Sequence, residues 1–93
     1  MRTIKQTSHF KRDLKREAKG KHRSSLEEHL MPVLDALAND QPLEPRHCDH
    51  PLIGDWKDFR DCHVKPDLIL VYQKPEADTL VLVRLGSHSE LGL

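Results

Sequence analysis

The sequence predicts a small α+β domain, in which a short N-terminal strand and a helical hairpin pack on a mainly antiparallel sheet in the order β-α-α-β-β-β. Helical periodicity fills residues 7–38, and short apolar runs separated by turn residues fill the last third of the chain. Ninety-three residues suit one domain over residues 1–93. The composition, 37% hydrophobic and 32% charged, is typical of a soluble globular protein, and no apolar run reaches the roughly 18 residues of a membrane span.

The first helix follows a short strand. Residues 2–6 alternate in polarity, which predicts an edge strand. Thr7 or Ser8 is a suitable N-cap for the helix that comes next, and Gly20 ends it. Its spacing predicts one apolar face, made of Phe10, Leu14 and Ala18.

The second helix completes an antiparallel hairpin with the first. Ser24 or Ser25 can cap it, and Pro32 is expected either to kink it or to mark where it effectively starts. A wider apolar stripe predicts the buried side, which consists of Leu26, Leu30, Val33, Leu34, Leu37 and Ala38.

Residues 39–55 are expected to form a long loop, because three prolines and a glycine forbid regular structure of any length, and so long a loop indicates a functional role. A meander of three strands then follows, with hairpin-length connections. The last two strands are nearly continuous apolar runs, so they are expected to be central and covered by the helices on one face. Gly86 ends the last strand and residues 87–93 are expected to be a short tail; the three strands are 57–64, 67–73 and 79–85.

The two cysteines, Cys48 and Cys62, are expected to be reduced, because the N-terminus carries no signal segment and the protein is therefore predicted to be cytoplasmic. Cys62 in a strand is interpreted as a small buried hydrophobe. A zinc site is a minor alternative, since the spacing of the available ligands fits no closed tetrahedral pattern. Those ligands are His47, Cys48, His50, Cys62 and His63.

The zero net charge conceals a basic N-terminal third. Residues 1–23 hold nine Lys and Arg against two acidic residues, and 9 − 2 gives +7. Such a run predicts binding to an anionic polymer, with a solvated helix face as the alternative. The candidate residues for such binding are Lys11, Arg12, Lys15, Arg16, Lys19, Lys21 and Arg23.

Residues 47–67 concentrate three histidines, the only tryptophan and several carboxylates, and a second cluster, Arg84-x-Gly86-Ser87-His88, lies near the C-terminus. Imidazole, with an unperturbed pKa of about 6.5, is suited to proton transfer near neutral pH. Trp56 and Phe59 are interpreted as core anchors rather than as platforms for stacked bases. The remaining histidines are expected at the surface: His9, His22, His29 and His47.

These motifs resemble the YafQ branch of the RelE superfamily, the toxins of type II toxin–antitoxin pairs, over essentially the whole chain. The similarity lies in the basic helical hairpin, in the C-terminal cluster and in the stretch His50-Pro51-Leu52-x-Gly54-x-Trp56-Lys57-x-Phe59-Arg60-Asp61-x-His63-Val64-x-Pro66-Asp67. The resemblance implies a RelE-like microbial RNase fold and a ribosome-dependent mRNA endoribonuclease that inhibits translation. It implies three partners, the 70S ribosome, mRNA and a cognate antitoxin of ribbon-helix-helix type with an acidic C-terminal segment, and neither a membrane nor a cofactor.

Metal-free RNA cleavage needs a base for the ribose 2′-OH, an acid for the departing 5′-oxygen and a fixed cation for the phosphate. The resemblance assigns proton transfer to His50, His63, Asp67 and His88, and phosphate stabilisation to Arg84. His50 is favoured as base and His88 as acid, although two imidazoles can exchange these roles. The expected products are a 2′,3′-cyclic phosphate and a 5′-hydroxyl.

Two structural readings stay open at this point. His63 could be a hydrogen-bonded strand residue and Asp67 a turn residue, which would fit an inactive RNA- or antitoxin-binding module of the same fold. The chain also departs from the family at its C-terminus, where an aromatic residue is common. The sequence Leu91-Gly92-Leu93 stands there instead, so the resemblance implies neither C-terminal stacking on an mRNA base nor a codon preference for this chain.

Overall fold

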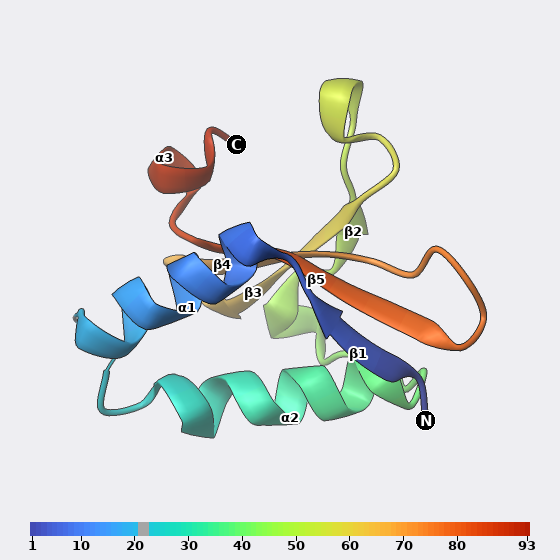
Figure 1. Cartoon of the computed structure of the whole chain (residues 1–93), viewed down its shortest axis with the longest axis horizontal. Coiled ribbons are helices and arrows are strands. Elements are labelled where there is room, and N and C mark those ends of the chain that lie inside the picture. Colours follow the sequence, from blue (N-terminus) through green and yellow to red (C-terminus); the bar gives the residue numbers. More distant parts are fainter. Residues whose placement is uncertain (21–22) are drawn as a thin grey trace.

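The computed structural model describes residues 1–20 and 23–93, and it confirms the predicted α+β class (Figure 1). A five-stranded sheet has the strand order β1-β5-β4-β3-β2. The elements are β1 (Thr3–Gln6), α1 (Ser8–Lys19), α2 (Leu26–Ala38), the 3-10 turn η1 (Pro45–His47), β2 (His50–Pro51), the 3-10 turn η2 (Gly54–Trp56), β3 (Arg60–Lys65), β4 (Leu68–Gln73), β5 (Thr79–Gly86) and α3 (His88–Leu91).

Strands β3 to β5 form the predicted antiparallel meander, β2 adds an antiparallel strand beside β3 that was not predicted, and β1 adds a parallel edge beside β5. β3 begins at Arg60, later than expected, because η2 and the turn after it occupy the preceding residues. The loop of residues 39–55 contains the 3-10 turn η1, the two-residue strand β2 and the start of η2, so it is more ordered than the sequence indicated.

The helices begin as predicted. Thr7 caps α1, since its side-chain oxygen accepts a hydrogen bond from the Phe10 amide at 3.0 Å. Helix α2 runs through Pro32 without interruption, and its whole predicted apolar stripe is buried. Helix α1 differs from expectation, because Ala18 is exposed whereas Asp13 and Glu17 are buried.

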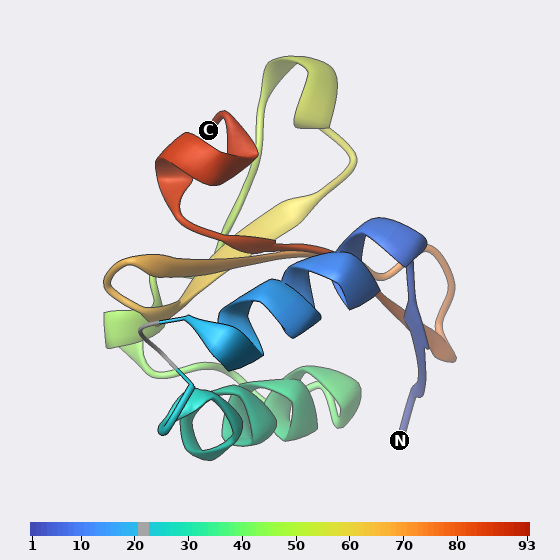
Figure 2. The ribbon, with the colours of Figure 1, turned by 60° about the vertical axis from the view of Figure 1, so that its left-hand side comes forward.

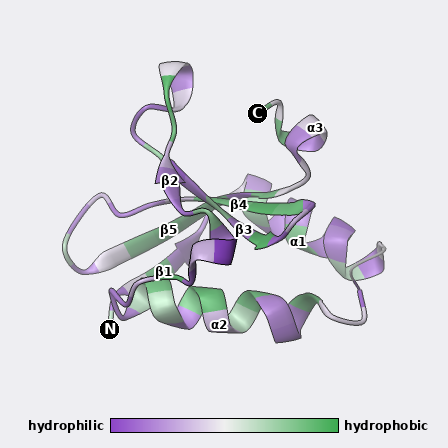
Figure 3. Ribbon diagram, turned by 180° about the vertical axis from the view of Figure 1, so that it is seen from behind, coloured by the Kyte–Doolittle hydropathy of each residue, from purple (hydrophilic) through white to green (hydrophobic). Residues whose placement is uncertain are grey.

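The sheet separates two apolar clusters. The larger lies between the sheet and helices α1 and α2, and it contains Phe10, Cys62 and Tyr72. The smaller lies on the opposite face, around Ile69 and Val71, where α3 and the loop containing η2 cover the sheet; we call this the α3 face. Figure 2 shows the two long helices on one side of the sheet and α3 on the other, and Figure 3 shows hydrophobic residues along β4 and β5.

The C-terminal residues are not a loose tail. They form α3, whose N-terminus carries a capping box between Ser87 and Glu90, and Leu91 is buried. Both cysteines are free thiols; Cys62 is buried, as predicted, and burial raises the pKa of its thiol. In the part of the chain that the structure describes, no helix has the length and apolar character needed to cross a membrane.

Candidate active site

Strand register brings the predicted site residues together on the α3 face. Directly paired residues of neighbouring strands share a face, and here one row crosses four strands from His50 through Asp61 and Val71 to Arg84. His63 lies two residues after Asp61 on β3, so it points to the same face. The two histidine-bearing segments and the C-terminal arginine therefore belong to one site.

Asp61 is the buried centre of this site. Its side chain is 2% exposed, and the Nε2 atom of half-exposed His50 lies 3.1 Å from its Oδ1. Within the described residues this buried oxygen accepts no hydrogen bond, and the imidazole interacts with it as an ion-pair partner. Burial raises the pKa of Asp61, and the nearby His50, His63 and His88 oppose that shift.

His63 and His88 meet beside this carboxylate. Their ring centroids are 5.4 Å apart and the rings are inclined at 62°. His88 is the first residue of α3, and the capping box of that helix fixes where the imidazole emerges. The structure therefore gathers three of the predicted histidines around Asp61. Asp67, the fourth predicted proton-transfer residue, is exposed in the turn between β3 and β4.

Arg84, the predicted phosphate-stabilising cation, is held by a carboxylate of α1. Its Nε donates to Asp13 Oδ2 at 2.7 Å and its Nη2 to Asp13 Oδ1 at 3.3 Å. The Arg84 side chain is 25% exposed and that of Asp13 is 4% exposed. No hydrogen bond within the described residues engages Nη1, which leaves that nitrogen to contact a phosphate oxygen.

Asp13 and Arg16 also replace a missing strand. β1 pairs with β5 only as far as Gln6, whereas β5 continues to Gly86, so the last residues of β5 have an unpaired edge. The Leu85 amide donates to Asp13 Oδ2 at 3.0 Å, and Arg16 Nη2 donates to the Leu85 carbonyl at 2.8 Å. Side chains of α1 thus satisfy the backbone groups that a neighbouring strand would satisfy.

Arg16 therefore differs from the other candidate RNA-binding residues. Its Nη1 donates to Asp13, and its Nε lies 3.0 Å from Glu17 Oε2 and 3.3 Å from Glu90 Oε2. The glycine of the C-terminal motif makes this arrangement possible, because a Cβ at Gly86 would lie 2.8 Å from Arg16 Nη2. Internal partners occupy all three guanidinium nitrogens, so the expectation that Arg16 contacts rRNA is not supported by its geometry.

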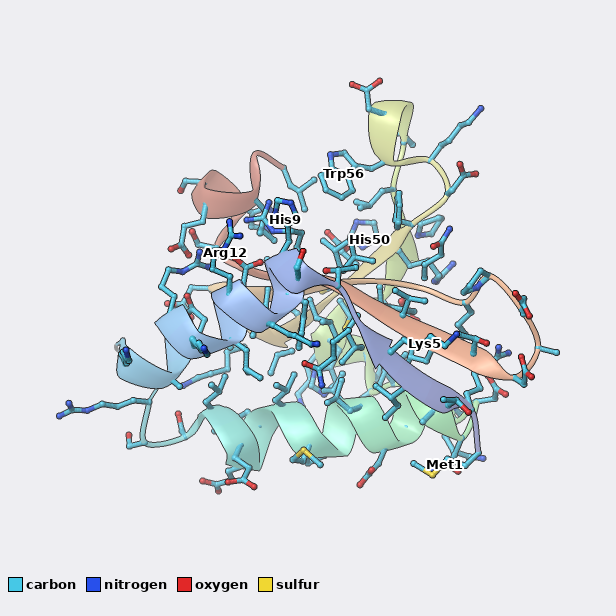
Figure 4. All side chains as sticks on the ribbon, in the orientation of Figure 1. Met1, Lys5, His9, Arg12, His50 and Trp56 are labelled. Carbon is cyan, nitrogen blue, oxygen red and sulfur yellow. The ribbon has the colours of Figure 1, made fainter. Side chains whose placement is uncertain are left out.

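The remaining basic candidates keep their predicted exposure. Helix α1 exposes Lys11, Arg12 and Lys15, and Figure 4 shows Arg12 and His9 on this helix. Lys19 and Arg23 are also exposed, whereas Lys21 and His22 lie outside the residues that the structure describes.

Two further residues shape the loop that carries His50. His47, expected at the surface, is buried, and its Nδ1 lies 2.6 Å from the carbonyl oxygen of His63. The Tyr72 hydroxyl donates to Asp49 Oδ1, and burial together with that carboxylate raises the pKa of the phenol. Both contacts tie the loop to the sheet immediately before His50.

Sequence reasoning missed the two central carboxylates. Asp61 lies inside the recognised motif, and its i, i+2 relation to His63 on a strand was the signal that could have placed it in the site. Asp13 gave no such signal, because its role depends on where β1 ends relative to β5.

The minor zinc alternative fails on geometry. Cys62 lies in the cluster under the helices, whereas the adjacent His63 lies on the α3 face, so the proposed ligands do not converge. Among residues 1–20 and 23–93, no group of three or more His, Cys, Asp or Glu side chains is arranged to hold a metal ion.

Comparison with known proteins identifies the family. Residues 2–92 match the sequence model described as "Bacterial toxin of type II toxin-antitoxin system, YafQ". The chain belongs to the YafQ family. The mRNA interferase toxin YafQ of Escherichia coli K12 is 36% identical over 90 residues, which cover 97% of this chain and 95% of that protein.

Solved structures of YafQ relatives have the same fold. The crystal structure of the E. coli DinJ-YafQ complex matches with a TM-score of 0.83 and 35% identity, covering 98% of each chain. A metal-bound toxin from Helicobacter pylori matches with a TM-score of 0.82 and 50% identity, covering 98% of this chain and 99% of that one. The family that the sequence motifs indicated is thereby confirmed.

Proposed function

We propose that this YafQ toxin is an mRNA interferase that cuts mRNA on the ribosome by metal-independent acid–base catalysis. The observation that carries the proposal is the gathering of His50, His63 and His88 around buried Asp61, in the same strand row as Arg84. The E. coli relative named mRNA interferase supports the choice of substrate.

In this mechanism an imidazole removes the proton of the ribose 2′-OH, and that oxygen attacks the adjacent phosphorus. His50 serves as the base: the Cys48 carbonyl, 2.6 Å from its Nδ1, favours a proton on that nitrogen and leaves Nε2 to accept the 2′-OH proton, and Asp61 beside Nε2 stabilises the imidazolium that results. His88 donates a proton to the departing 5′-oxygen, with His63 beside it. Asp67, in the β3–β4 turn, has the role of orienting or tuning one of these imidazoles. The products are a 2′,3′-cyclic phosphate and a 5′-hydroxyl.

Arg84 supplies the fixed positive charge. Asp13 holds Nε and Nη2 in place, so the guanidinium does not have to be ordered when the phosphorane forms, and Nη1 is directed to a non-bridging oxygen. Preorganisation of this kind favours the transition state over the bound substrate.

The proposed partners are the 70S ribosome, its mRNA and a cognate antitoxin, and the proposed location is the cytoplasm, where ribosomes work. The exposed lysines of α1 offer charge to rRNA phosphates. A complex of DinJ with YafQ is known for the E. coli relative, which supports an antitoxin partner here. A ribbon-helix-helix antitoxin with an acidic C-terminal segment would complement the basic helix.

No step of this mechanism passes through a metal. The H. pylori relative is described as metal-bound, but the described residues of this chain contain no group arranged to hold a metal ion. The cleavage assay is therefore also run with transition metals removed by chelation.

The test compares cleavage of one mRNA in two states, bound to programmed ribosomes and free in solution. The parent is expected to cut only ribosome-bound mRNA. His88→Ala and Arg84→Lys should lose cleavage while keeping the fold, because lysine retains a charge near Asp13 but lacks the planar fork. Ser89→Ala, the exposed neighbour in α3, is the matched control. Cleavage at the parental rate by His88→Ala would refute the role of His88 as the acid, and absence of cleavage by the parent would favour the inactive-module alternative. Equal cutting of free mRNA would refute ribosome dependence.

A further inference from the structure

A small pocket opens beside Arg84 that the proposed mechanism does not use. Its volume is about 200 Å³, and it is lined by Thr7, His9, Trp56, Val83 and Arg84. Figure 4 shows Trp56 above the N-terminal end of α1, where His9 lies. The pocket therefore joins the start of α1, the η2 loop and the end of β5.

A β-bulge in β5 turns two of its side chains toward this pocket. Val71 of β4 pairs with Arg84, but the next residue, Tyr72, pairs with Leu82, so Val83 is an extra residue in β5. Bulges of this kind re-aim side chains and are frequent beside active sites. The consequence here is that consecutive residues, Val83 and Arg84, both line the pocket.

The lining combines three planar groups. Trp56 is half-buried, and Phe59 packs edge-on against it with ring centroids 5.5 Å apart and an interplanar angle of 69°. The ring is therefore supported on one side and accessible on the pocket side. His9 adds an imidazole, and Arg84 adds a guanidinium whose position Asp13 fixes. Aromatic rings and arginine planes are the groups on which unpaired bases of RNA stack.

The size and position of the pocket agree with one base. Pockets that enclose drug-sized ligands have volumes of roughly 300–1,000 Å³, and this pocket is smaller, so it suits a single ring system rather than a whole nucleotide. Arg84 belongs both to the pocket and to the row that contains Asp61 and His50. A base in the pocket would thus adjoin a phosphate held by Arg84.

We propose that Trp56 and His9 form a nucleobase subsite that holds an unpaired mRNA base next to the scissile phosphate, a role that rests on the proposed endonuclease function. Leu91 and Leu93 do not take this role, since Leu91 is buried in the cluster of the α3 face and Leu93 packs against the same cluster. Trp56 instead supplies an aromatic stacking surface beside Arg84.

The first test is direct binding, because Trp56 is the only tryptophan and its fluorescence reports on stacking. The four nucleoside 5′-monophosphates are titrated in turn into the purified protein, with ribose 5-phosphate as the base-free control. We expect saturable quenching by nucleotides at millimolar concentration and none by ribose 5-phosphate. His9→Ala should weaken binding, whereas His29→Ala, an imidazole on α2, should not. Absence of saturable quenching, or equal quenching by ribose 5-phosphate, would overturn the subsite.

The second test is cleavage on programmed ribosomes. Loss of one stacked base is expected to raise KM for ribosome-bound mRNA by roughly 5- to 150-fold, from about 1–3 kcal/mol of stacking per base. Trp56→Leu and His9→Ala should show this rise together with a weaker preference for the base beside the cut, and Trp56→Phe should retain much of both. His9→Ala removes no core contact, so it remains informative if Trp56→Leu does not fold.

The outcomes separate the two proposals. Suppose that the parent cleaves mRNA and that both His9→Ala and a folded Trp56→Leu keep the parental KM and base preference. The subsite is then refuted, and the endonuclease function stands. If the parent does not cleave mRNA at all, the endonuclease function is refuted, and the fluorescence titration alone decides whether the pocket binds a base.

Discussion

Asp13→Asn is the substitution that most sharply tests how the site is held together. Each carboxylate oxygen of Asp13 accepts two hydrogen bonds: Oδ2 from Arg84 Nε and the Leu85 amide, and Oδ1 from Arg16 Nη1 and Arg84 Nη2. An asparagine has one acceptor oxygen, so whichever way its amide is turned, two of the four donors face an NH2 group.

The expected cost follows from those two lost bonds. Hydrogen bonds to charged groups contribute about 1.5–3 kcal/mol each, but the Arg16 side chain is 41% exposed, so water replaces part of what it loses. We expect a loss of about 2–4 kcal/mol in the free energy of unfolding. For a domain of this size that corresponds to a fall in Tm of roughly 10–25 °C.

The pH dependence gives a second signature. Burial alone would raise the pKa of Asp13, but the hydrogen bonds from Arg84 and Leu85 and the charges of Arg84 and Arg16 outweigh it and lower the pKa. A lowered folded-state pKa stabilises the protein above the unfolded value of about 3.9, and that stability is lost as the pH falls through the folded value. The difference between the parent and Asp13→Asn should be full between about pH 6 and 8 and should close below about pH 4.

The assay is urea denaturation followed by far-UV circular dichroism over that pH range. Asp35→Asn, an exposed aspartate on α2, is the matched control and should change stability by less than about 0.5 kcal/mol. A loss below about 0.5 kcal/mol for Asp13→Asn, or a loss that does not depend on pH, would refute the reasoning. In the ribosome assay the variant should also cleave more slowly, because Arg84 is no longer fixed.

Three further predictions concern other parts of the site. Asp61→Asn should raise Tm at neutral pH and reduce cleavage, since burial raises the Asp61 pKa; the gain in Tm should shrink as the pH falls through that raised pKa. Gly86→Ala should destabilise the fold by about 1–3 kcal/mol in urea denaturation, because its Cβ would displace Arg16. Replacing Lys11 and Lys15 by glutamine should weaken ribosome binding and reduce the slope of log K against log salt by up to about 2.

The three variants have separate controls and separate contradicting outcomes. An unchanged or lower Tm for Asp61→Asn would show that the carboxylate is not strained. Gly20→Ala adds a Cβ no closer than 3.5 Å to its neighbours and should be tolerated, so equal losses at both glycines would contradict the role of Gly86. An unaltered salt slope for the lysine variant would show that this face of α1 is merely solvated.

Local patterns predicted the parts of the fold that local physics decides. The apolar stripe of α2 is buried as its spacing indicated, and Thr7 caps α1 because its hydroxyl satisfies an amide within the same turn. The C-terminal helix α3 was missed, because its stability comes from Leu91 burying itself against the sheet as well as from its capping box.

The sequence predicted only those site residues whose side-chain type indicates chemistry. The histidines and Arg84 could be recognised in this way, but the residues that position them could not. Asp13 and Arg16 are charged residues on a helix with the spacing of a solvated face, and they become internal because β1 ends before β5 does. His47 was wrongly placed at the surface for a similar reason, since the His63 carbonyl that it contacts lies 16 residues away in sequence.

The chemistry of the cut is the central claim, and the end groups of the cleaved mRNA test it most directly. Ribosomes programmed with end-labelled mRNA are treated with the parent protein, with magnesium kept to preserve the ribosome and transition metals removed by chelation. Acid–base catalysis by His50, His63 and His88 predicts undiminished cleavage that leaves a 2′,3′-cyclic phosphate, or its 3′-phosphate hydrolysis product, and a 5′-hydroxyl. A 3′-hydroxyl with a 5′-phosphate, or cleavage that stops on chelation and returns with zinc or copper, would contradict the account.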